Sequence, residues 1–177
     1  EETQTTAYLK AELEKMGYQP QPLLETGLYV FIDHGYGKSV AFRTDIDGLP
    51  VNEETGVDFA STHKGIMHAC GHDGHMTALL GFAKALKENK EPILYDILLI
   101  FQPAEESPGG ARIVCEKGLL KQFNVESIFG IHLMPLLDEG VIASKPGGLM
   151  AECGELDVKV TGRGAHAGLP HEGVDSL

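Results

Sequence analysis

The feature that most constrains the fold is an eight-residue stretch from His68 to His75, which contains three histidines, one cysteine and one aspartate. Imidazole, thiolate and carboxylate groups are the usual protein ligands of transition metals. Cys70 and His72 are two residues apart, so in an extended segment both side chains would leave the backbone on one face. The stretch therefore predicts a metal-binding loop, which the rest of the fold has to hold rigidly.

A helix is predicted directly after this stretch. Asp73 is its predicted N-cap, and its end is predicted near Asn89. Apolar residues recur between them at helical spacing. These residues are Met76, Leu79, Leu80, Ala83 and Leu86. We therefore expect the first turn of a buried helix to position the ligand loop.

Two known classes of metal site do not fit the stretch. A zincin needs HExxH, and although His68 and His72 have the required spacing, Ala69 stands where the general base would be. A zinc deaminase needs H-x-E followed by P-C-x-x-C, and neither pattern occurs. On composition alone, a histidine-rich turn with a buried structural cysteine remains an alternative.

The pattern of strands and helices predicts an α/β fold. Residues 28–33 and 39–45 are strand-like and are joined by a four-residue segment with the composition of a hairpin turn. Residues 97–101 form a continuous apolar run, typical of a central and often parallel strand. Residues 1–16 and 110–120 are predicted helices, in addition to the helix after the histidine-rich stretch.

Polar groups follow the predicted strands at their carboxyl ends. Glu105 and Glu106 come after the apolar strand, at the edge where open α/β sheets place their sites. Adjacent side chains point in different directions, so one carboxylate can bind a metal while the other faces a reacting water as general base. His132 ends another predicted buried strand, over residues 127–131. Taken singly, an acidic surface loop and a packed histidine are the commoner alternatives.

Asp47 has two alternative interpretations. The second predicted strand runs out into residues 43–50, which carry alternate charged side chains before a Gly/Pro stop. An acid at such a place commonly orients a metal-binding histidine through the ring nitrogen that does not bind the metal. The other interpretation is a solvated strand end. Residues 51–67 follow as a predicted loop over the sheet.

A domain boundary is predicted near Gly147, within a Lys-Pro-Gly-Gly linker. We expect a first domain over residues 1–147 and the start of a second over residues 148–177. Residues 141–143 are a candidate short strand before this boundary, and residues 155–161 alternate as a half-exposed strand after it. A glycine-rich loop with two histidines, His166 and His171, follows.

Composition narrows the range of partners and compartments. The chain has 177 residues, a formal charge of −12 and only 14 scattered Lys and Arg residues, which argues against binding to nucleic acid or anionic membranes. The three cysteines are not regularly spaced, and there is neither a membrane-spanning run nor a signal-peptide pattern. We therefore expect a cytoplasmic protein that acts on small molecules. The chain opens in mid-helix without a start methionine, so we expect that its natural N-terminus has been lost or removed.

Five motifs together resemble one family. RTDIDGLP, HACGHDGH, FQPAEE, the GIH that ends at His132 and GRGAHAGLPH occur in the order and rough spacing of the metal-dependent amidohydrolases related to carboxypeptidase G. The nearest branch looks like the one with hippurate hydrolase, N-acetyldiaminopimelate deacetylase and the auxin-conjugate hydrolases. The resemblance covers essentially the whole chain.

The resemblance implies a zinc-exopeptidase-like catalytic domain with a mixed, largely parallel sheet flanked by helices, followed by the start of a smaller α+β lid and dimerisation domain. It also implies a site for two divalent metal ions, foremost Zn or Mn, with Co or Ni as alternatives. The implied ligands are Cys70, which bridges the two ions, His72, Glu106 and His132. Glu105 would be the general base, and His166 would help bind the scissile carbonyl oxygen, in related enzymes from the partner subunit of a homodimer.

The implied reaction is hydrolysis of the amide bond of an N-acyl amino acid by a water that two metal ions activate. A dipeptidase or exopeptidase of the same family is one alternative. A non-catalytic homologue that binds metal or acyl amino acids is another, although the presence of Glu105 argues against it. Relatives are about twice this length and have a C-terminal histidine ligand that this sequence lacks. The sequence specifies neither the acyl group nor the amino acid.

Overall fold

The computed structural model describes residues 2–151 and 156–176. The chain divides into two compact units, Glu1–Leu136 and Leu137–Leu177. The first unit contains the sheet and all of the described α-helices. The second contains a short 3-10 helix, Pro170–Glu172, and an isolated bridge between Arg163 and Val174.

The first unit is built on a five-stranded sheet with the order β1-β2-β4-β3-β5. β3 runs parallel to both of its neighbours, β4 and β5, whereas β2 is antiparallel to β1 and β4. Only β2 therefore runs against the other strands, and the predicted α/β fold with a mixed, largely parallel sheet is confirmed. The strands are β1 (Gln21–Leu23), β2 (Gly27–Ile32), β3 (Ser39–Asp45), β4 (Asp96–Gln102) and β5 (Val125–Gly130).

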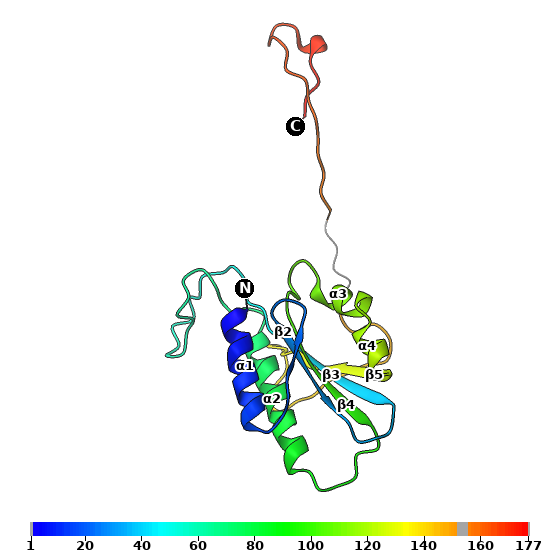
Figure 1. The fold of residues 1–177 in the computed structure, drawn as a ribbon. Coiled ribbons are helices and arrows are strands. Elements are labelled where there is room, and N and C mark those ends of the chain that lie inside the picture. The colour runs from blue at the N-terminus through cyan, green and yellow to red at the C-terminus, as the bar shows by residue number, and fades with distance from the viewer. Residues whose placement is uncertain (1, 152–155, 177) are drawn as a thin grey trace. The chain divides into compact units, whose positions relative to one another are not determined.

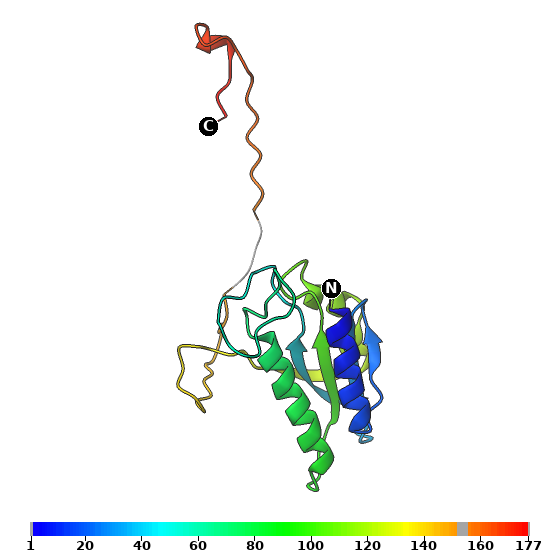
Figure 2. The same ribbon diagram turned by 90° about the vertical axis from the view of Figure 1, so that its left-hand side faces the viewer.

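Helices cover both faces of this sheet (Figures 1 and 2). α1 (Thr3–Lys15) and α2 (His72–Glu88) pack on one face, and α3 (Gly110–Glu116) and α4 (Leu119–Gln122) on the other. α1 and α2 each pack against the sheet through one apolar face. Such a face forms because the apolar side chains of each helix recur at the helical period. No helix in the described parts of the chain is long and apolar enough to cross a membrane.

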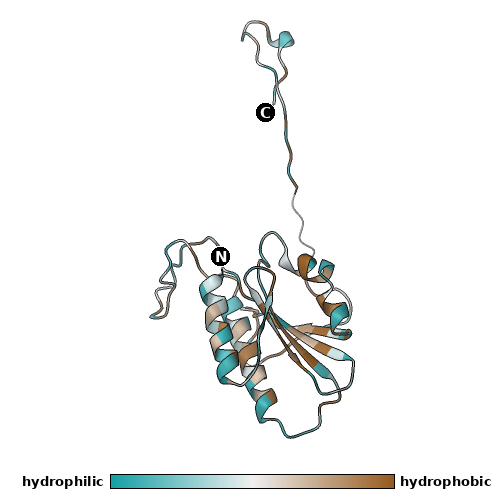
Figure 3. Ribbon diagram, viewed as in Figure 1, coloured by the Kyte–Doolittle hydropathy of each residue, from teal (hydrophilic) through white to brown (hydrophobic). Residues whose placement is uncertain are grey.

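β4 is the centre of the core, as its continuous apolar sequence predicts, and every residue of it is buried. Successive side chains point to opposite faces. Leu99 and Phe101 therefore pack with α1 and α2, while Leu98 and Ile100 pack with α3 and α4. Figure 3 shows the resulting apolar colour of the inner strands. Full burial of each such side chain contributes about 1.5–3 kcal/mol.

The predicted hairpin between β2 and β3 is wrong, because β4 lies between them. The connecting turn is fixed by the first residue of β4. The buried carboxylate of Asp96 accepts hydrogen bonds from the backbone N–H groups of His34, Tyr36 and Gly37 at 2.8, 3.2 and 2.9 Å. The turn therefore passes around the start of β4 instead of joining two adjacent strands.

Two other predicted strands differ from the structure. β5 occupies the edge of the sheet and is exposed rather than buried, with Phe129 55% exposed. Residues 141–143 and 156–161 form no strand, since no neighbouring segment among the described residues hydrogen-bonds to them as a ladder. Residue 155 lies outside the described part of the chain.

Helix ends also depart from the predictions at two points. α2 begins at His72 with Gly71 in the N-cap position, so Asp73 lies in the first turn and its carboxylate accepts the N–H of Gly74 at 2.9 Å. The helix predicted over residues 110–120 is interrupted at Gly118, which has φ 79° and separates α3 from α4. The loop predicted over residues 51–67 is confirmed.

The connections that follow β3 and β4 lead to opposite faces of the sheet. β3 leads into α2 on one face of the sheet, and its neighbour β4 leads into α3 on the opposite face. In open α/β sheets, the crevice outside the carboxyl ends of two such strands is where ligands bind. The topology therefore places a site beside the ends of β3 and β4, at the start of α2.

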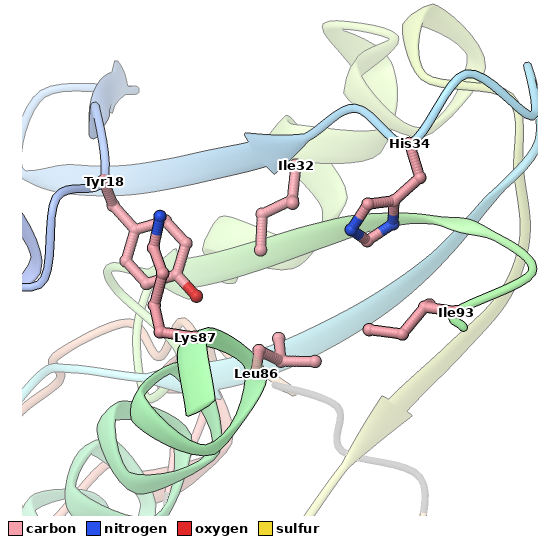
Figure 4. A pocket seen from close by; sticks show the side chains of 6 residues that line it. All are labelled: Tyr18, Ile32, His34, Leu86, Lys87 and Ile93. Atoms are coloured by element: carbon pink, nitrogen blue, oxygen red, sulfur yellow. The ribbon is translucent and has the colours of Figure 1, made fainter. Parts of the chain in front are cut away.

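The opposite end of α2 carries a separate pocket of about 170 Å³. Lys87 lies there with its Nζ atom 4.2 Å from the centre of the Tyr18 ring. Figure 4 shows the side chains around it. They are Tyr18, Ile32, His34, Leu86, Lys87 and Ile93. Because Lys87 is fifteen residues beyond His72 on the same helix, this pocket is distinct from the crevice.

We predict that Asp96→Asn destabilises the whole protein at neutral pH. Burial alone would raise the pKa of Asp96, but the backbone N–H groups of His34, Tyr36 and Gly37 lower it below its ordinary value of 3.8. A carboxyl with a lowered folded-state pKa stabilises the fold above its unfolded pKa, and this contribution is lost as the pH falls through the folded value. Thermal unfolding midpoints should therefore differ at pH 7 and converge below pH 3.8. Asp58→Asn, at an exposed loop position, is the control; an equal loss at all pH values would contradict the prediction.

Candidate metal centre

The structure brings the predicted metal ligands together in the crevice. Cys70, His72 and Glu106 each offer one ligand atom, and these atoms lie within 4.8 Å of one another. His132 follows β5, and its Nε2 atom lies 3.6 Å from Cys70 Sγ. Side chains from the start of α2, the loop after β4 and the segment after β5 therefore converge on one point.

Gly71 allows Cys70 and His72 to share this centre. The segment between them is not extended, because Gly71 adopts φ 85°, in the left-handed region that favours glycine. α2 begins immediately afterwards with His72, which is buried. The two side chains therefore meet through a turn at a helix start rather than through an extended segment.

The ring of His72 is held in one orientation by Asp47. Its Nδ1 atom lies 3.0 Å from the Asp47 carbonyl oxygen and 3.2 Å from the carboxylate Oδ1. Nδ1–H therefore donates to Asp47, and Nε2 is left as the free ring nitrogen. Nε2 points towards three carboxylates. They belong to Asp45 at 3.7 Å, Glu106 at 3.8 Å and Glu105 at 3.9 Å.

Asp47 also holds the loop that carries the two glutamates. Its Oδ2 atom accepts the backbone N–H of Glu106 at 2.9 Å. Burial alone would raise the pKa of Asp47, but the hydrogen bonds from His72 and from the backbone of Glu106 lower it to about 2. A buried, ionised acid that contacts a histidine ring is not a solvated strand end. Of the two interpretations of Asp47, the orienting role is the one that the structure supports.

The charge of the crevice favours a cation. Asp45 pairs with Arg43 at 2.9 Å, and among the described residues no other Lys or Arg pairs with its acids. Burial, followed by the charges of Glu106, Glu105 and Asp45, raises the pKa of the Cys70 thiol to about 11. A divalent cation would reverse this effect by stabilising the thiolate. Sulfur, nitrogen and oxygen donors so close together fit such an ion.

Two residues of the crevice were not predicted from the sequence. Asp45 is the last residue of β3, and its Oδ1 atom lies 2.8 Å from His75 Nδ1. Both residues are buried, with 3% of each exposed. One available signal was that His75 lies three residues after His72, on the same side of the helix. The other was that Asp45 ends a strand whose neighbour leads to the predicted ligands.

Other predicted residues differ in their surroundings. Glu105 lies beside the cluster with 39% of its side chain exposed, compared with 28% for Glu106. His166 belongs to the second unit, where it is exposed and its Nδ1 atom accepts the N–H of Gly168 at 3.1 Å. Its proposed action at a metal centre stays a prediction.

Comparisons with known proteins agree with this geometry. The sequence model of peptidase family M20/M25/M40 matches residues 41–176. N-acetyl-L-cysteine deacetylase of Bacillus subtilis (strain 168) is 46% identical over 100% of this chain and 42% of its own length. IAA-amino acid hydrolase ILR1-like 5 of Arabidopsis thaliana is 43% identical over 100% of this chain and 40% of its own length. The chain thus spans about two fifths of these relatives.

A solved structure is similar over the same region. The Bacillus subtilis YXEP protein, described as a dinuclear metal binding peptidase from the M20 family, superposes with a TM-score of 0.78 and 39% sequence identity. The alignment covers 83% of this chain and 42% of the YXEP chain. The M20 proteins are therefore similar to this chain in both sequence and fold.

We predict that Cys70→Ser weakens metal binding far more than Cys115→Ser. Cys70 lies among the other candidate ligands, whereas Cys115 is an exposed residue of α3. Serine keeps the size of cysteine but does not supply a thiolate. In the whole protein, Cys70→Ser should therefore lower the zinc affinity by more than about 10- to 100-fold. That is the loss typical when a metal ligand keeps its place but loses a hydrogen-bond partner.

Two measurements check this: a zinc competition titration for the affinity, and the metal content per chain for the stoichiometry. Cys115→Ser is the matched control, because it makes the same change outside the cluster. Cys153 lies outside the described residues. Equal affinity and stoichiometry in both variants would remove Cys70 from the site.

Proposed function

The chain belongs to peptidase family M20/M25/M40, and from that premise we propose that the whole protein is a metal-dependent amidohydrolase. Its substrates would be N-acyl amino acids, which it would cleave to a carboxylic acid and a free amino acid. The names of two relatives support this substrate class, since N-acetyl-L-cysteine and IAA-amino acids are both N-acyl amino acids. The observation that carries the proposal is the more exposed carboxylate of Glu105 beside the ligand cluster.

The cluster supplies the residues that would hold the metal. Two divalent ions would be bound, with Zn or Mn as the first candidates and Co or Ni as alternatives, because the mixed donor set suits several of them. The proposed ligands are Cys70, His72, Glu106 and His132. Bound cations would polarise the acyl carbonyl and lower the pKa of a water molecule.

Glu105 is the proposed general base. It would take a proton from the attacking water and later give it to the nitrogen of the leaving amine as the C–N bond breaks. Its carboxylate lies close to His72 Nε2, at 3.9 Å, yet is outside the set of three ligand atoms within 4.8 Å of one another. Its exposure leaves it accessible to substrate and water.

The predicted second domain, residues 148–177, is proposed to contribute to the site of a homodimer. We assign residues 1–147 to a catalytic domain and 148–177 to the beginning of a lid domain that pairs two subunits. Leu156, Val158 and Val160 support this assignment, since these alternating apolar side chains are 88%, 73% and 64% exposed and suit burial against a further layer. His166 would bind the scissile carbonyl oxygen of the partner subunit's substrate, and the protein would act in the cytoplasm.

We predict that the whole protein, supplied with Zn or Mn, hydrolyses N-acyl amino acids and that Glu105→Gln abolishes this activity. A general base typically contributes about 10² to 10⁴ in rate, so kcat should fall by about that factor. A panel of N-acetyl, N-benzoyl and N-indolylacetyl amino acids and unblocked dipeptides, with release of free amino acid as the signal, is the measurement.

Metal content distinguishes the two carboxylates in this experiment. Glu105→Gln should keep its metals, whereas Glu106→Gln should lose them. Metal loss in the first variant with retention in the second would reverse the assignment. Cleavage of dipeptides alone would favour an exopeptidase, and metal binding without turnover of any compound would favour a non-catalytic homologue.

We also predict that two inactive variants complement each other. If each site borrows His166 from the partner subunit, a heterodimer of Glu105→Gln and His166→Ala protomers has one site with both groups intact. The other site carries both lesions, so activity should recover to at most half of the wild-type value. Verified heterodimers without recovered activity would rule out the shared site, because a site that used its own His166 would gain nothing from mixing.

A further inference from the structure

Leu133 is the residue through which the segment after β5 is fixed. Its backbone N–H donates to His75 Nε2 at 2.9 Å. Its carbonyl oxygen accepts from His132 Nδ1 at 2.7 Å. His132 Nδ1 therefore carries a proton, which leaves Nε2, 3.6 Å from Cys70 Sγ, as the ring nitrogen that can bind a metal. The two backbone groups of Leu133 thus set both the position and the tautomer of His132.

Both ring nitrogens of His75 are used by these contacts. Since Nε2 accepts from Leu133, Nδ1 carries the proton and donates to Asp45 Oδ1 at 2.8 Å. Asp45 in turn accepts from Arg43 at 2.9 Å. Although Asp45, His72 and His75 lie close enough together to hold a cation, His75 has no ring nitrogen left for one.

The side chain of Leu133, which is 49% exposed, lies against Gly74 of α2 and against its N-cap Gly71. A methyl group at Gly74 would lie 2.5 Å from Leu133 Cδ1, and one at Gly71 would lie 3.2 Å from the same atom. Real Cβ atoms do not approach a neighbour as closely as the first of these distances. A side chain at Gly74 would therefore displace the end of the Leu133 side chain from its place beside α2. The rings of His75 and His132 also pack edge to face, with their centres 4.6 Å apart.

We propose that His75 is a positioning residue that clamps the backbone of Leu133, with Gly74 leaving room for the Leu133 side chain, and thereby fixes the direction in which His132 presents Nε2 to the metal cluster. This proposal rests on the proposed function only in taking His132 as a metal ligand. It assigns the end of the histidine-rich stretch a task other than ligation. The beginning of the stretch would supply ligands, and its end would dock the segment that carries another ligand.

The first test uses two glycines of the same helix. Gly74→Ala should lower the zinc affinity of the whole protein by about 10- to 100-fold, the loss typical when the support of a ligand is removed. Gly81→Ala is the matched control, because a Cβ there meets nothing within 4 Å and the position is exposed. Leu133→Ala should retain affinity, since its backbone N–H remains, and the double variant Gly74→Ala/Leu133→Ala should recover the affinity of Leu133→Ala.

The second test separates the two contacts of His75. His75→Gln keeps an amide oxygen near the position of Nε2 and should retain most of the zinc affinity. His75→Asn keeps only a donor near the position of Nδ1 and should lose affinity as Gly74→Ala does. Zinc competition titrations and metal content per chain are the primary measurements, with the thermal unfolding midpoint of each metal-free variant recorded alongside.

Several outcomes would overturn the clamp. Wild-type zinc affinity in Gly74→Ala would do so, as would a loss that Leu133→Ala does not relieve. Equal losses in His75→Gln and His75→Asn would do so too, because the contact of Nε2 with Leu133 would then not be what supports metal binding. These measurements need no substrate, so an inactive protein with the predicted metal-binding pattern would refute the proposed function alone. An active protein whose variants all bind zinc equally would refute the clamp alone.

Discussion

The contact between Asp47 and His72 is the interaction on which the rest of the crevice depends. One aspartate, just beyond β3, meets the first residue of α2 through its carbonyl and carboxylate oxygens, and it also holds the backbone of Glu106. Three segments that are far apart in the sequence are thereby fixed to one another at the edge of the sheet. Because Asp47 is buried, each of these contacts is electrostatically stronger than it would be in water. The orientation of the free His72 nitrogen follows from the same contact.

The concentration of negative charge explains why such tethers are needed. Asp45, Glu105 and Glu106 all approach His72 Nε2 within 3.9 Å, and their mutual repulsion would separate flexible loops. The backbone hydrogen bond from Glu106 to Asp47 and the pairing of Arg43 with Asp45 resist that repulsion. A cation would then bind to groups that are already in position. Its binding free energy would add to the stability of the fold, because an unfolded chain does not present this set of ligands.

The sequence predicted the chemistry of the crevice better than its supporting contacts. Cys70, His72 and the two glutamates were predicted because metal ligands are few in type and gather at the carboxyl ends of strands, and the structure brings these residues close together. The hairpin prediction failed because strand order depends on a long-range contact, that of the Asp96 carboxylate with the turn after β2. The exposure of β5 was missed for a similar reason, since apolar residues look the same in a central strand and an edge strand. His75 was overlooked because a histidine that positions its neighbours has no sequence pattern distinct from that of a ligand.

The acidic residues of the crevice differ in how firmly each side chain is held. Asp45 and Asp47 are buried. The Asp45 carboxylate accepts from Arg43 and His75, while Asp47 accepts the backbone N–H of Glu106 at its carboxylate and the His72 ring at its carbonyl oxygen. Glu105 is the most exposed carboxylate beside the cluster. A group that passes a proton between water and a leaving amine has to reach both, so full immobilisation would work against it. Under the proposed hydrolytic function, rigid acids that orient the ligands and a freer acid beside them would be complementary requirements of one site, and their order along the chain follows from which strand end each acid occupies.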